Sequence, residues 1–551
     1  MKPKALYIAV SALLGGGMVM PAHALQLYVD AKTGQVYTTP GAGRSKLGDF
    51  EQVSEHHAAK HGHENDKSAH HKSTHVASAY EEPSYLKANV ATPEDIKKVE
   101  EKLNARIDGV VNKPKKPNEA KTTIDDKGIR FETNDGNFKF SLNGRLHTDA
   151  AVFSGGDIFT YNAKTPDGAY KGQTLTDNRQ SDGTEIRRLR MEFAGQFYED
   201  WKFKVQPEFA NAGTVEKGQY TVGIRDAFVQ YTGFGEYGSF TMGQSKQPYS
   251  FQQMMSSNDM VFMERSSEYA FTNTSVNRAL GLRYDLAGQW WGLGAGIYGD
   301  TATPQTSGTS DAPDEGWGGA ARFTMAPWLK SNEVFHVGMS GAYRAPQSDN
   351  RTLHYKFKQT AMSPMAYLDT GSMTDIQNSQ FINGEMVGVY GPFSLETEYN
   401  ATWINSNPSS TSPGSSVGNG YMQGAHVDMA YSLTGESRAT TYRPDQGVIG
   451  RLKPNHNLDF SDGWGAWEAK ARFAWVDMNQ IANKSFAGGN EVSSTIGVNW
   501  YFNNWSRFML DWTHVYSLNV GSAGVNRTVY DQPGHNTGDW DVVQARISLA
   551  Y

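Results

Sequence analysis

The amino-acid sequence contains no cysteine among its 551 residues. Disulfide bonds, thiolate metal sites and cysteine nucleophiles are therefore excluded. The sequence also lacks any internal apolar stretch near the roughly 20 residues that a membrane-spanning helix needs, which argues against a helical membrane protein. A formal net charge of -7 disfavours nucleic acid as a partner, because binding to the phosphate backbone requires a basic surface.

Glycine and aromatic residues are abundant instead. The chain has 57 Gly, 27 Tyr, 26 Phe and 13 Trp, while only 20% of its residues are charged. Glycine serves turns and bends, and aromatic side chains form the two interfacial girdles of an outer-membrane barrel. The composition suits such a barrel, although a secreted β-sandwich shares it.

The first 24 residues have the pattern of a secretory signal peptide. Lys2 and Lys4 form a basic end, residues 5–20 form an apolar core, and Ala22-His23-Ala24 is a small-x-small cleavage site. We expect the mature chain to begin at Leu25. Export of a chain without cysteine favours a Gram-negative cell envelope over a disulfide-dense extracellular domain.

Residues 25–50 resemble a small β-hairpin module, and residues 51–91 form a polar linker. Seven of the fifteen histidines fall between positions 56 and 75. Imidazole binds zinc, nickel and copper, so a metal-collecting tract is one interpretation. No carboxylate or cysteine stands at a fixed ligand spacing there, and we therefore favour a disordered, solvated linker and assign no metal ligand.

Residues 92–112 predict a short helix. Thr92 suits the N-cap, Pro93 suits the first helical position, and Pro114 lies beyond the end. Apolar side chains recur at three- and four-residue steps, at Ile96, Val99, Leu103, Ile107 and Val110. So short a helix is marginal alone in water, and we expect it to pack against copies of itself as a coiled coil. The alternative is a single amphipathic helix lying on the mouth of a barrel.

Apolar and charged residues alternate strictly between Glu185 and Phe209. The pattern predicts two strands joined by a turn at residues 198–200. One face carries Leu189, Met191, Phe193, Trp201, Phe203 and Val205, and the other carries Arg188, Arg190, Glu192, Lys202, Lys204 and Glu208. This hairpin fits either a soluble sandwich or a membrane barrel with lipid outside and a charged, water-filled lumen inside.

Alternating segments of about ten residues repeat from Gly128 to Tyr551, separated by polar loops. The last strand sets Val543, Ala545, Ile547 and Leu549 on one face and ends on the aromatic Tyr551, as an outer-membrane assembly signal does. Tight connections such as residues 390–393 and long ones such as residues 345–380 predict short periplasmic turns and long external loops. Residues 128–551 allow roughly 16 to 18 strands around an aqueous channel. The export signal, the absence of cysteine and the terminal aromatic strand decide for the barrel over the sandwich.

Several short segments of this region match a known family in sequence order. They are Gly-Arg-Leu-His-Thr-Asp at 144–149, Ile-Arg-Arg at 186–188 with Asp-Trp at 200–201, Asp-Ala-Phe-Val-Gln-Tyr at 226–231, Ser-Ser at 256–257 with Phe-Met-Glu-Arg-Ser at 262–266, Leu-Thr-Gly-Glu at 433–436, Gly-Ala-Trp-Glu at 465–468 and Gly-Val-Asn-Trp-Tyr at 497–501. These segments resemble the phosphate-selective porins of the O and P type. The resemblance implies an all-β transmembrane antiparallel barrel of about 16 strands. It also implies that the barrel forms a homotrimer and lets anions pass down their gradient.

The resemblance also implies which residues contact anions. The family's arginine pair falls on Arg187 and Arg188, and its carboxylate beside the constriction falls on Asp226; Arg190, Lys202 and Lys204 share the charged face of the hairpin. By alternation alone Arg187 shares the apolar face, where an arginine at the membrane midplane costs about 2 to 4 kcal/mol. A bulge or a rim position would relieve that cost.

Two departures from the phosphate-specific members concern the constriction. Where those members carry a key lysine, Gln253 occupies the matching position. Their dense arginine ladder in a mid-chain loop is thinned to Arg351, His354, Lys356 and Lys358. We therefore expect a general preference for anions with a weakened phosphate site.

We predict an outer-membrane porin for passive diffusion of small anions such as phosphate or pyrophosphate, with no catalytic residue and no cofactor. A general or sugar-permeable diffusion porin is the alternative. An outer-membrane barrel enzyme is a remote alternative, because none of the histidines after the linker lies in a nucleophile motif. Expected partners are the permeating anions, outer-membrane lipid and lipopolysaccharide, and further copies of the chain; the N-terminal extension is expected in the periplasm.

Overall fold

The structure is a computed structural model of the whole chain. The residues that it describes are 25–30, 36–37, 44–50, 94, 97–98, 101–102, 119–125, 128–155, 159–162, 175–177, 182–210, 222–271, 277–300, 315–346, 351–360, 362, 366, 368–407, 417–483, 486–520, 527–529 and 540–551. No helix among them is long and apolar enough to cross a membrane.

Residues 1–104 form one unit and residues 105–551 another. In the first unit, β1 (Leu25–Asp30) pairs antiparallel with β2 (Val36–Tyr37) and with β3 (Arg44–Phe50). The described residues of the predicted helix at 92–112 are helical and exposed: Glu94, Lys97, Lys98, Glu101 and Lys102. The predicted signal peptide, the His-rich linker and the apolar stripe of that helix lie outside the described residues.

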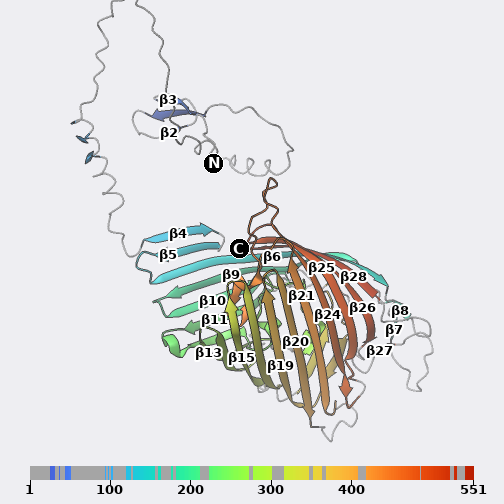
Figure 1. Cartoon of the computed structure of the whole chain (residues 1–551). Coiled ribbons are helices and arrows are strands. Elements are labelled where there is room, and N and C mark those ends of the chain that lie inside the picture. Colours follow the sequence, from blue (N-terminus) through green and yellow to red (C-terminus); the bar gives the residue numbers. More distant parts are fainter. Residues whose placement is uncertain are drawn as a thin grey trace, which may run out of the picture. The chain divides into compact units, whose positions relative to one another are not determined.

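In the second unit, sixteen antiparallel strands close into a barrel (Figure 1). They are β6 (Phe138–Gly155), β9 (Gly183–Phe197), β10 (Trp201–Glu208), β11 (Gly223–Tyr231), β12 (Ser239–Lys246), β13 (Arg278–Ala287), β14 (Trp291–Tyr298), β15 (Trp317–Lys330), β16 (Glu333–Ala345), β19 (Ile376–Tyr390), β20 (Phe393–Ser406), β21 (Gly420–Ser432), β24 (Ala466–Ile481), β25 (Gly489–Tyr501), β26 (Ser506–Val520) and β28 (Trp540–Ala550). The expected all-β barrel of 16 strands is confirmed.

The barrel closes between its first and last strands. β28 pairs with β6 along its length, and Gly144 and Tyr551 exchange two backbone hydrogen bonds of 3.1 Å. Before Gly144, the edge of β6 pairs with β5 (Gly128–Thr133), which pairs in turn with β4 (Ala120–Asp125). The hairpin of β4 and β5 therefore continues the sheet edge at the point where the terminal strand ends.

Side chains alternate between the two faces of the barrel wall as their types predict. In β24, Glu468 and Lys470 are buried on the lumenal side, at 1% and 4% exposed, whereas Phe473 is 52% exposed on the outer side. Leu189 and Trp201 of the predicted hairpin are likewise exposed on the outer face. An apolar outer face and a charged inner face are what a lipid-embedded barrel with a water-filled lumen requires.

A bulge in β9 places two consecutive arginines on the lumenal side. Opposite β6, Arg188 pairs with His147 and Ile186 pairs with Thr148, which leaves Arg187 as an extra residue without a strand partner. This extra residue breaks the strict alternation that would turn Arg187 toward lipid. β9 ends at Phe197 and β10 begins at Trp201, so the predicted turn at residues 198–200 is confirmed.

Connections on one rim are short, with one exception. Only residues 391–392 join β19 to β20, and residues 502–505 join β25 to β26. Between β21 and β24, however, residues 433–465, called the return segment below, extend into the lumen, where Arg322 of β15 donates to the backbone oxygens of Gln446 and Gly447 at 2.8 and 2.7 Å. The expectation of uniformly short turns on this rim is wrong at that connection.

A long connection from the opposite rim also folds inward. Residues 247–271 of this connection, called the inner loop below, carry the short helix α2 (Phe251–Met254) and the 3-10 helix η3 (Ser267–Phe271). Phe251, Met255 and Met260 of this loop form a buried cluster with inner-wall and return-segment residues, among them Val387, Val389, Val448 and Ile449. The inner loop and the return segment thus fill one side of the lumen.

A hairpin in the connection between β16 and β19 adds to this filling. β17 (Leu353–Phe357) pairs with β18 (Leu368–Met373), and Leu353, Tyr355, Leu368 and Met373 are buried in a second apolar cluster. The open part of the lumen is therefore confined to the side of β9 to β13.

Candidate functional site: a cationic channel constriction

An open cavity of about 1370 Å³ lies beside the inner loop. Side chains from β6, β9 to β13, the inner loop, β17 and the return segment line it. The lining holds fourteen cationic side chains, which are Arg145, Arg187, Arg188, Arg190, Lys202, Lys204, Arg225, Lys246, Arg265, Arg278, Arg283, Lys356, Lys358 and Arg443. It holds seven carboxylates, which are Glu192, Asp226, Glu236, Asp259, Glu264, Asp285 and Asp445. The lining is therefore strongly cationic although the whole chain is acidic.

Most of the residues proposed from the sequence meet at this cavity. Eight line it: Arg187, Arg188, Arg190, Lys202, Lys204, Asp226, Lys356 and Lys358. Gln253 does not; it is 1% exposed, and its amide donates to the Asn277 backbone oxygen at 2.9 Å and accepts from the Tyr269 hydroxyl. Arg351 lies apart from the lining and pairs with Asp375 at 3.0 Å.

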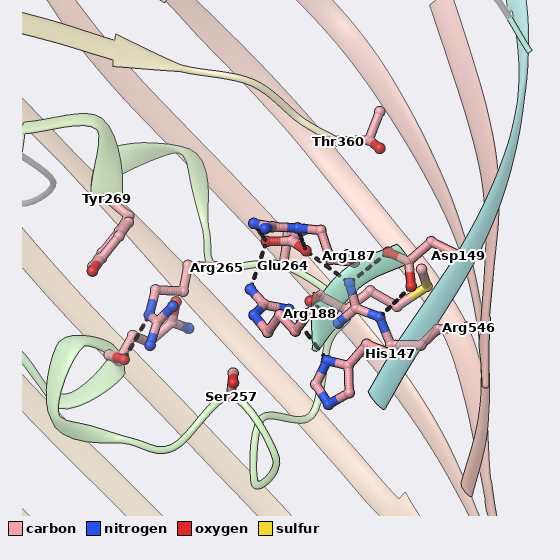
Figure 2. A network of polar contacts seen from close by, with 12 residues as sticks. His147, Asp149, Arg187, Arg188, Ser257, Glu264, Arg265, Tyr269, Thr360 and Arg546 are labelled. Atoms are coloured by element: carbon pink, nitrogen blue, oxygen red, sulfur yellow. Dashed lines mark hydrogen bonds and ion pairs between the residues drawn. The ribbon is translucent and has the colours of Figure 1, made fainter. Parts of the chain in front are cut away.

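The arginine pair of β9 is bound to a carboxylate of the inner loop. The Glu264 carboxylate accepts hydrogen bonds from Nε and Nη2 of Arg187 at 2.9 and 3.1 Å, and from Nη2 of Arg188 at 3.4 Å. Arg546 of β28 adds a third guanidinium at 2.8 Å and is itself bound to Asp149 at 2.7 and 2.6 Å. Figure 2 shows the three guanidinium groups gathered around the Glu264 carboxylate.

Glu264 is held in its ionised form. Burial raises the pKa of its carboxyl, but the charges of Arg187, Arg188 and Arg546 outweigh burial and hold the pKa well below its usual range. The inner loop is thus fixed to the barrel wall by a charged contact that lasts over the whole neutral range.

Other proposed cations also have carboxylate partners. Arg190 pairs with Glu208, which Arg225 also approaches at 3.5 Å. Lys204 lies 3.3 Å from Glu192, and Asp226 accepts from Arg278 at 2.7 Å. These pairs reduce the charge that the β9 and β10 hairpin offers to a solute.

Three cations at the cavity are held by neutral oxygens instead. Lys246 donates to the backbone oxygens of Met254 and Met255 at 3.1 and 2.9 Å, and Arg265 donates to those of Gln252 and Met255 at 2.7 and 3.3 Å. The side chain of Arg145 donates to the Ser257 hydroxyl at 2.9 Å. Among the described residues none of these three forms an ion pair with a carboxylate, so no salt bridge offsets their charge at the cavity.

These three residues are not among those predicted from the sequence. Arg145 and Arg265 lie within the family segments at 144–149 and 262–266, which was the available signal. Lys246 ends β12, and only the fold of the inner loop brings it against α2.

Buried ligand-type side chains also meet around His426, although not at the cavity. Glu268, Glu398 and His426 form one such group, and Glu396, His426 and Asp428 form another. His426 contacts Glu268 through Nδ1 and Glu396 through Nε2, and Arg472 binds Asp428 through two bonds of 2.6 Å. With these contacts the cluster joins the inner loop to β20, β21 and β24, and we assign it no metal.

The fold and the site together define an outer-membrane porin. A closed barrel with an apolar outer face, long loops on one rim and a water-accessible charged lumen forms a channel across the outer membrane of a Gram-negative bacterium. More narrowly, the chain belongs to the family of phosphate-selective porins O and P, whose model matches residues 162–547.

The individual relatives are similar to this chain only at low sequence identity. The chain is 25% identical to Porin O of Pseudomonas aeruginosa over 413 residues, which cover 68% of this chain and 83% of the relative. Among solved structures, a loop-deletion mutant of the outer membrane protein OmpT of Vibrio cholerae is 9% identical with a TM-score of 0.42, covering 75% of this chain and all of that one. The outer membrane channel DcaP of Acinetobacter baumannii is 12% identical with a TM-score of 0.39, covering 76% of this chain and 99% of that one.

Proposed function

We propose that this channel favours small inorganic anions such as phosphate or pyrophosphate over cations. The observation that carries the proposal is the twofold excess of cationic over acidic side chains around the cavity. Fixed charge of one sign in a narrow, low-dielectric channel concentrates counter-ions and excludes ions of the same charge.

Lys246 and Arg265 are the proposed centre of this preference. Both donate to the Met255 backbone oxygen, so their charges lie side by side and no carboxylate of the described residues neutralises them. An entering anion loses part of its hydration and finds ammonium and guanidinium donors in its place. Neutral backbone oxygens hold the two side chains in position without cancelling their charge, and binding stays shallow enough for release.

Reversal potentials in planar bilayers under a KCl gradient test the proposal. We expect an anion preference for the wild type that falls in Lys246→Gln and in Arg265→Gln. Lys330→Gln is the matched control, because Lys330 ends β15 at the rim, outside the cavity, and pairs with Glu333. A cation preference of the wild type, or equal potentials in wild type and both cavity variants, would contradict the proposal.

Passive permeation, rather than catalysis, is part of the same proposal. Support comes from the sequence, in which no nucleophile motif surrounds the histidines, and from a cavity lined by paired and unpaired cations. The general or sugar-permeable porin remains the second candidate; it predicts a wild type without charge preference in the same bilayer measurement.

The proposed assembly is a homotrimer in lipid and lipopolysaccharide. β10 to β14 hold only 8 to 10 residues, whereas the wall strands β15, β16, β19, β20, β21, β24, β25 and β26 hold 13 to 16. An eight-residue strand tilted by roughly 40° rises about 21 Å, which is less than the apolar band of roughly 25 Å. We call β10 to β14 the low sector, and partner copies would shield it.

The N-terminal assignments complete the proposal. β6 begins at the rim of short turns, which faces the periplasm in outer-membrane barrels. We propose that residues 25–112 lie in the periplasm after removal of residues 1–24, with residues 51–91 as a linker and residues 92–112 as a coiled coil.

A further inference from the structure

A row of five buried side chains runs along the inner wall beneath the inner loop. Tyr501, Arg507, Ser548, His147 and Arg188 are successive cross-strand partners on β25, β26, β28, β6 and β9. Cross-strand partners share a face of the sheet, so these side chains stand next to one another on the lumenal side. None is more than 3% exposed. Figure 2 shows the end of the row where His147 meets Arg188.

The inner loop and the return segment cover this row. The Asn258 side-chain oxygen lies 3.2 Å from Nε2 of His147, and the Met260 backbone oxygen accepts from Nη1 of Arg507 at 2.8 Å. Arg451 of the return segment donates Nε to the Asn258 backbone oxygen at 3.1 Å. Arg507 is therefore enclosed between the wall and two inward-folded segments.

Three polar atoms of this row have unused hydrogen-bonding capacity. Nε and Nη2 of Arg507 and Oγ of Ser548 are buried without a hydrogen-bond partner among the described residues. Within those residues Arg507 also forms no ion pair. A buried guanidinium that lacks both a counter-charge and partners for its donors is strongly unfavourable. Because Arg507 and Ser548 are direct cross-strand partners, one ligand atom between them can reach both side chains.

The surroundings add positive rather than negative charge. Arg188 and Arg451 are close neighbours of the row, and Arg188 donates to Nδ1 of His147 at 3.4 Å, which leaves the hydrogen of that imidazole on Nε2, toward Asn258. The carboxylates on the adjoining strands have partners of their own. Glu468 accepts from the Tyr501 hydroxyl of the row at 2.8 Å and is bound by Arg438 through contacts of 2.6 and 2.8 Å. Asp511 is paired with Lys470.

We propose that Arg507 and Ser548 bind a small monatomic anion, such as chloride, beneath the inner loop. Two guanidinium N–H groups and one hydroxyl offer donors toward a single point, and a halide accepts from all three. A water molecule would have to point its two hydrogens at groups that are themselves donors. A phosphate has four oxygens but would find only three donors there. The anion links β26 and β28 under the inner loop, and this structural role is independent of which ion the channel conducts.

Bromide replaces chloride and is visible by its anomalous scattering. In crystals of the full-length folded protein grown in NaBr, we expect an anomalous peak within hydrogen-bond distance of Nε of Arg507 and Oγ of Ser548. The peak should vanish in Ser548→Ala crystals or fall by more than half. Ordered water without anomalous signal at this place, or bromide bound only elsewhere, would overturn the proposal.

A solution measurement separates a bound anion from crystal conditions. Thermal unfolding in NaCl or NaBr is compared with sodium gluconate at equal ionic strength, and we expect halide to raise the Tm of the wild type. Arg507→Gln and Ser548→Ala should lose that increment, with folding verified by heat-modifiable migration on gels. Ser493→Ala is the matched control, since Ser493 is a buried lumenal serine of β25 whose hydroxyl already bonds Glu491 at 3.0 Å. An equal rise in Tm with halide in the wild type and in Ser548→Ala would contradict the proposal.

Discussion

Glu264 presents one carboxylate to three guanidinium groups, those of Arg187, Arg188 and Arg546. That is the contact set a tetrahedral oxyanion would make with the same arginines. Because Glu264 belongs to the inner loop and lines the cavity, it competes with any permeating anion for this cluster. At the scale of single residues, Glu264 therefore limits how strongly the arginine pair acts on a solute.

Neutralising this carboxylate should expose the cluster. In Glu264→Gln we expect a higher anion preference and a block of chloride current by phosphate on the order of tenfold stronger, because charge-assisted bonds to the arginines become available. The measurement is single-channel conductance in KCl with added phosphate. Asp285→Asn is the control: Asp285 also lines the cavity but pairs with Arg283 alone, so it should change the preference without creating the block.

The pH dependence of the Glu264 contact follows from its lowered pKa. A carboxyl whose pKa is lower in the folded state contributes its full stabilisation above the ordinary value of 4.5 and loses it only as pH falls through the lower folded value. The difference in anion preference between wild type and Glu264→Gln should thus stay constant from about pH 8 to about pH 5. A difference that disappears within this range would show that Glu264 is protonated there.

The sequence identified half of the cavity cations but not their pairing. Alternation and the family segments selected Arg188, Arg190, Lys202 and Lys204, since facing inward is a local property of a strand. The contact between Arg187 and Glu264 spans 77 positions and depends on the bulge in β9 and on the path of the inner loop. Neither is encoded in a local pattern, and for the same reason Gln253 could not be placed away from the cavity.

At the scale of elements, one wall residue holds the start of α2. Glu398 of β20 accepts the backbone N–H groups of Phe251 and Gln252 at 2.6 and 3.1 Å and the Ser250 hydroxyl at 3.2 Å. The side-chain amide of Asn383 donates to it at 3.0 Å. All these groups are buried, so the inner loop has no water to replace this acceptor.

Glu398→Ala should release the inner loop from the wall. Each buried donor left without its acceptor costs about 1 to 3 kcal/mol, which is enough to displace a short helix. We expect a larger and noisier single-channel conductance and a lower Tm, measured in bilayers and by thermal unfolding. Glu333→Ala, at the first residue of β16 and away from the inner loop, should leave both unchanged; an unaltered conductance in Glu398→Ala would mean that the loop is held by its apolar contacts instead.

Strands were predictable and the return segment was not. The end of β16 at Ala345 and the last strand agree with the expected boundaries because polar loops interrupt a period of two. Residues 433–465 carry the same loop signals as an external connection. Their place in the lumen depends on bonds such as that from Arg322 to Gln446, 124 positions apart.

At the scale of the whole molecule, the low sector is the feature that supports the proposed trimer. Its outer face exposes apolar side chains, including Met242 of β12 and its cross-strand partner Leu282 of β13, at 67% and 42%. A wall lower than the apolar band leaves lipid in contact with polar rim groups unless another protein surface covers it. Three copies joined at their low sectors would satisfy this requirement. The longer wall strands β15, β16, β19 to β21 and β24 to β26, called the tall sector, are able to face lipid by themselves.

The absence of cysteine allows a direct test of that arrangement. A single cysteine at Met242→Cys should lie within the interface, so a bifunctional thiol reagent would link pairs of copies and give a covalent dimer from the purified protein. Ile496→Cys is the matched position on the tall sector, 51% exposed on the outer face of β25, and should stay monomeric under denaturing conditions. Equal cross-linking at both positions would indicate random encounters, and cross-linking at Ile496→Cys alone would place the interface on the tall sector. A dimer from Met242→Cys alone is the outcome that the strand lengths predict, because a short wall is stable only where a partner replaces lipid.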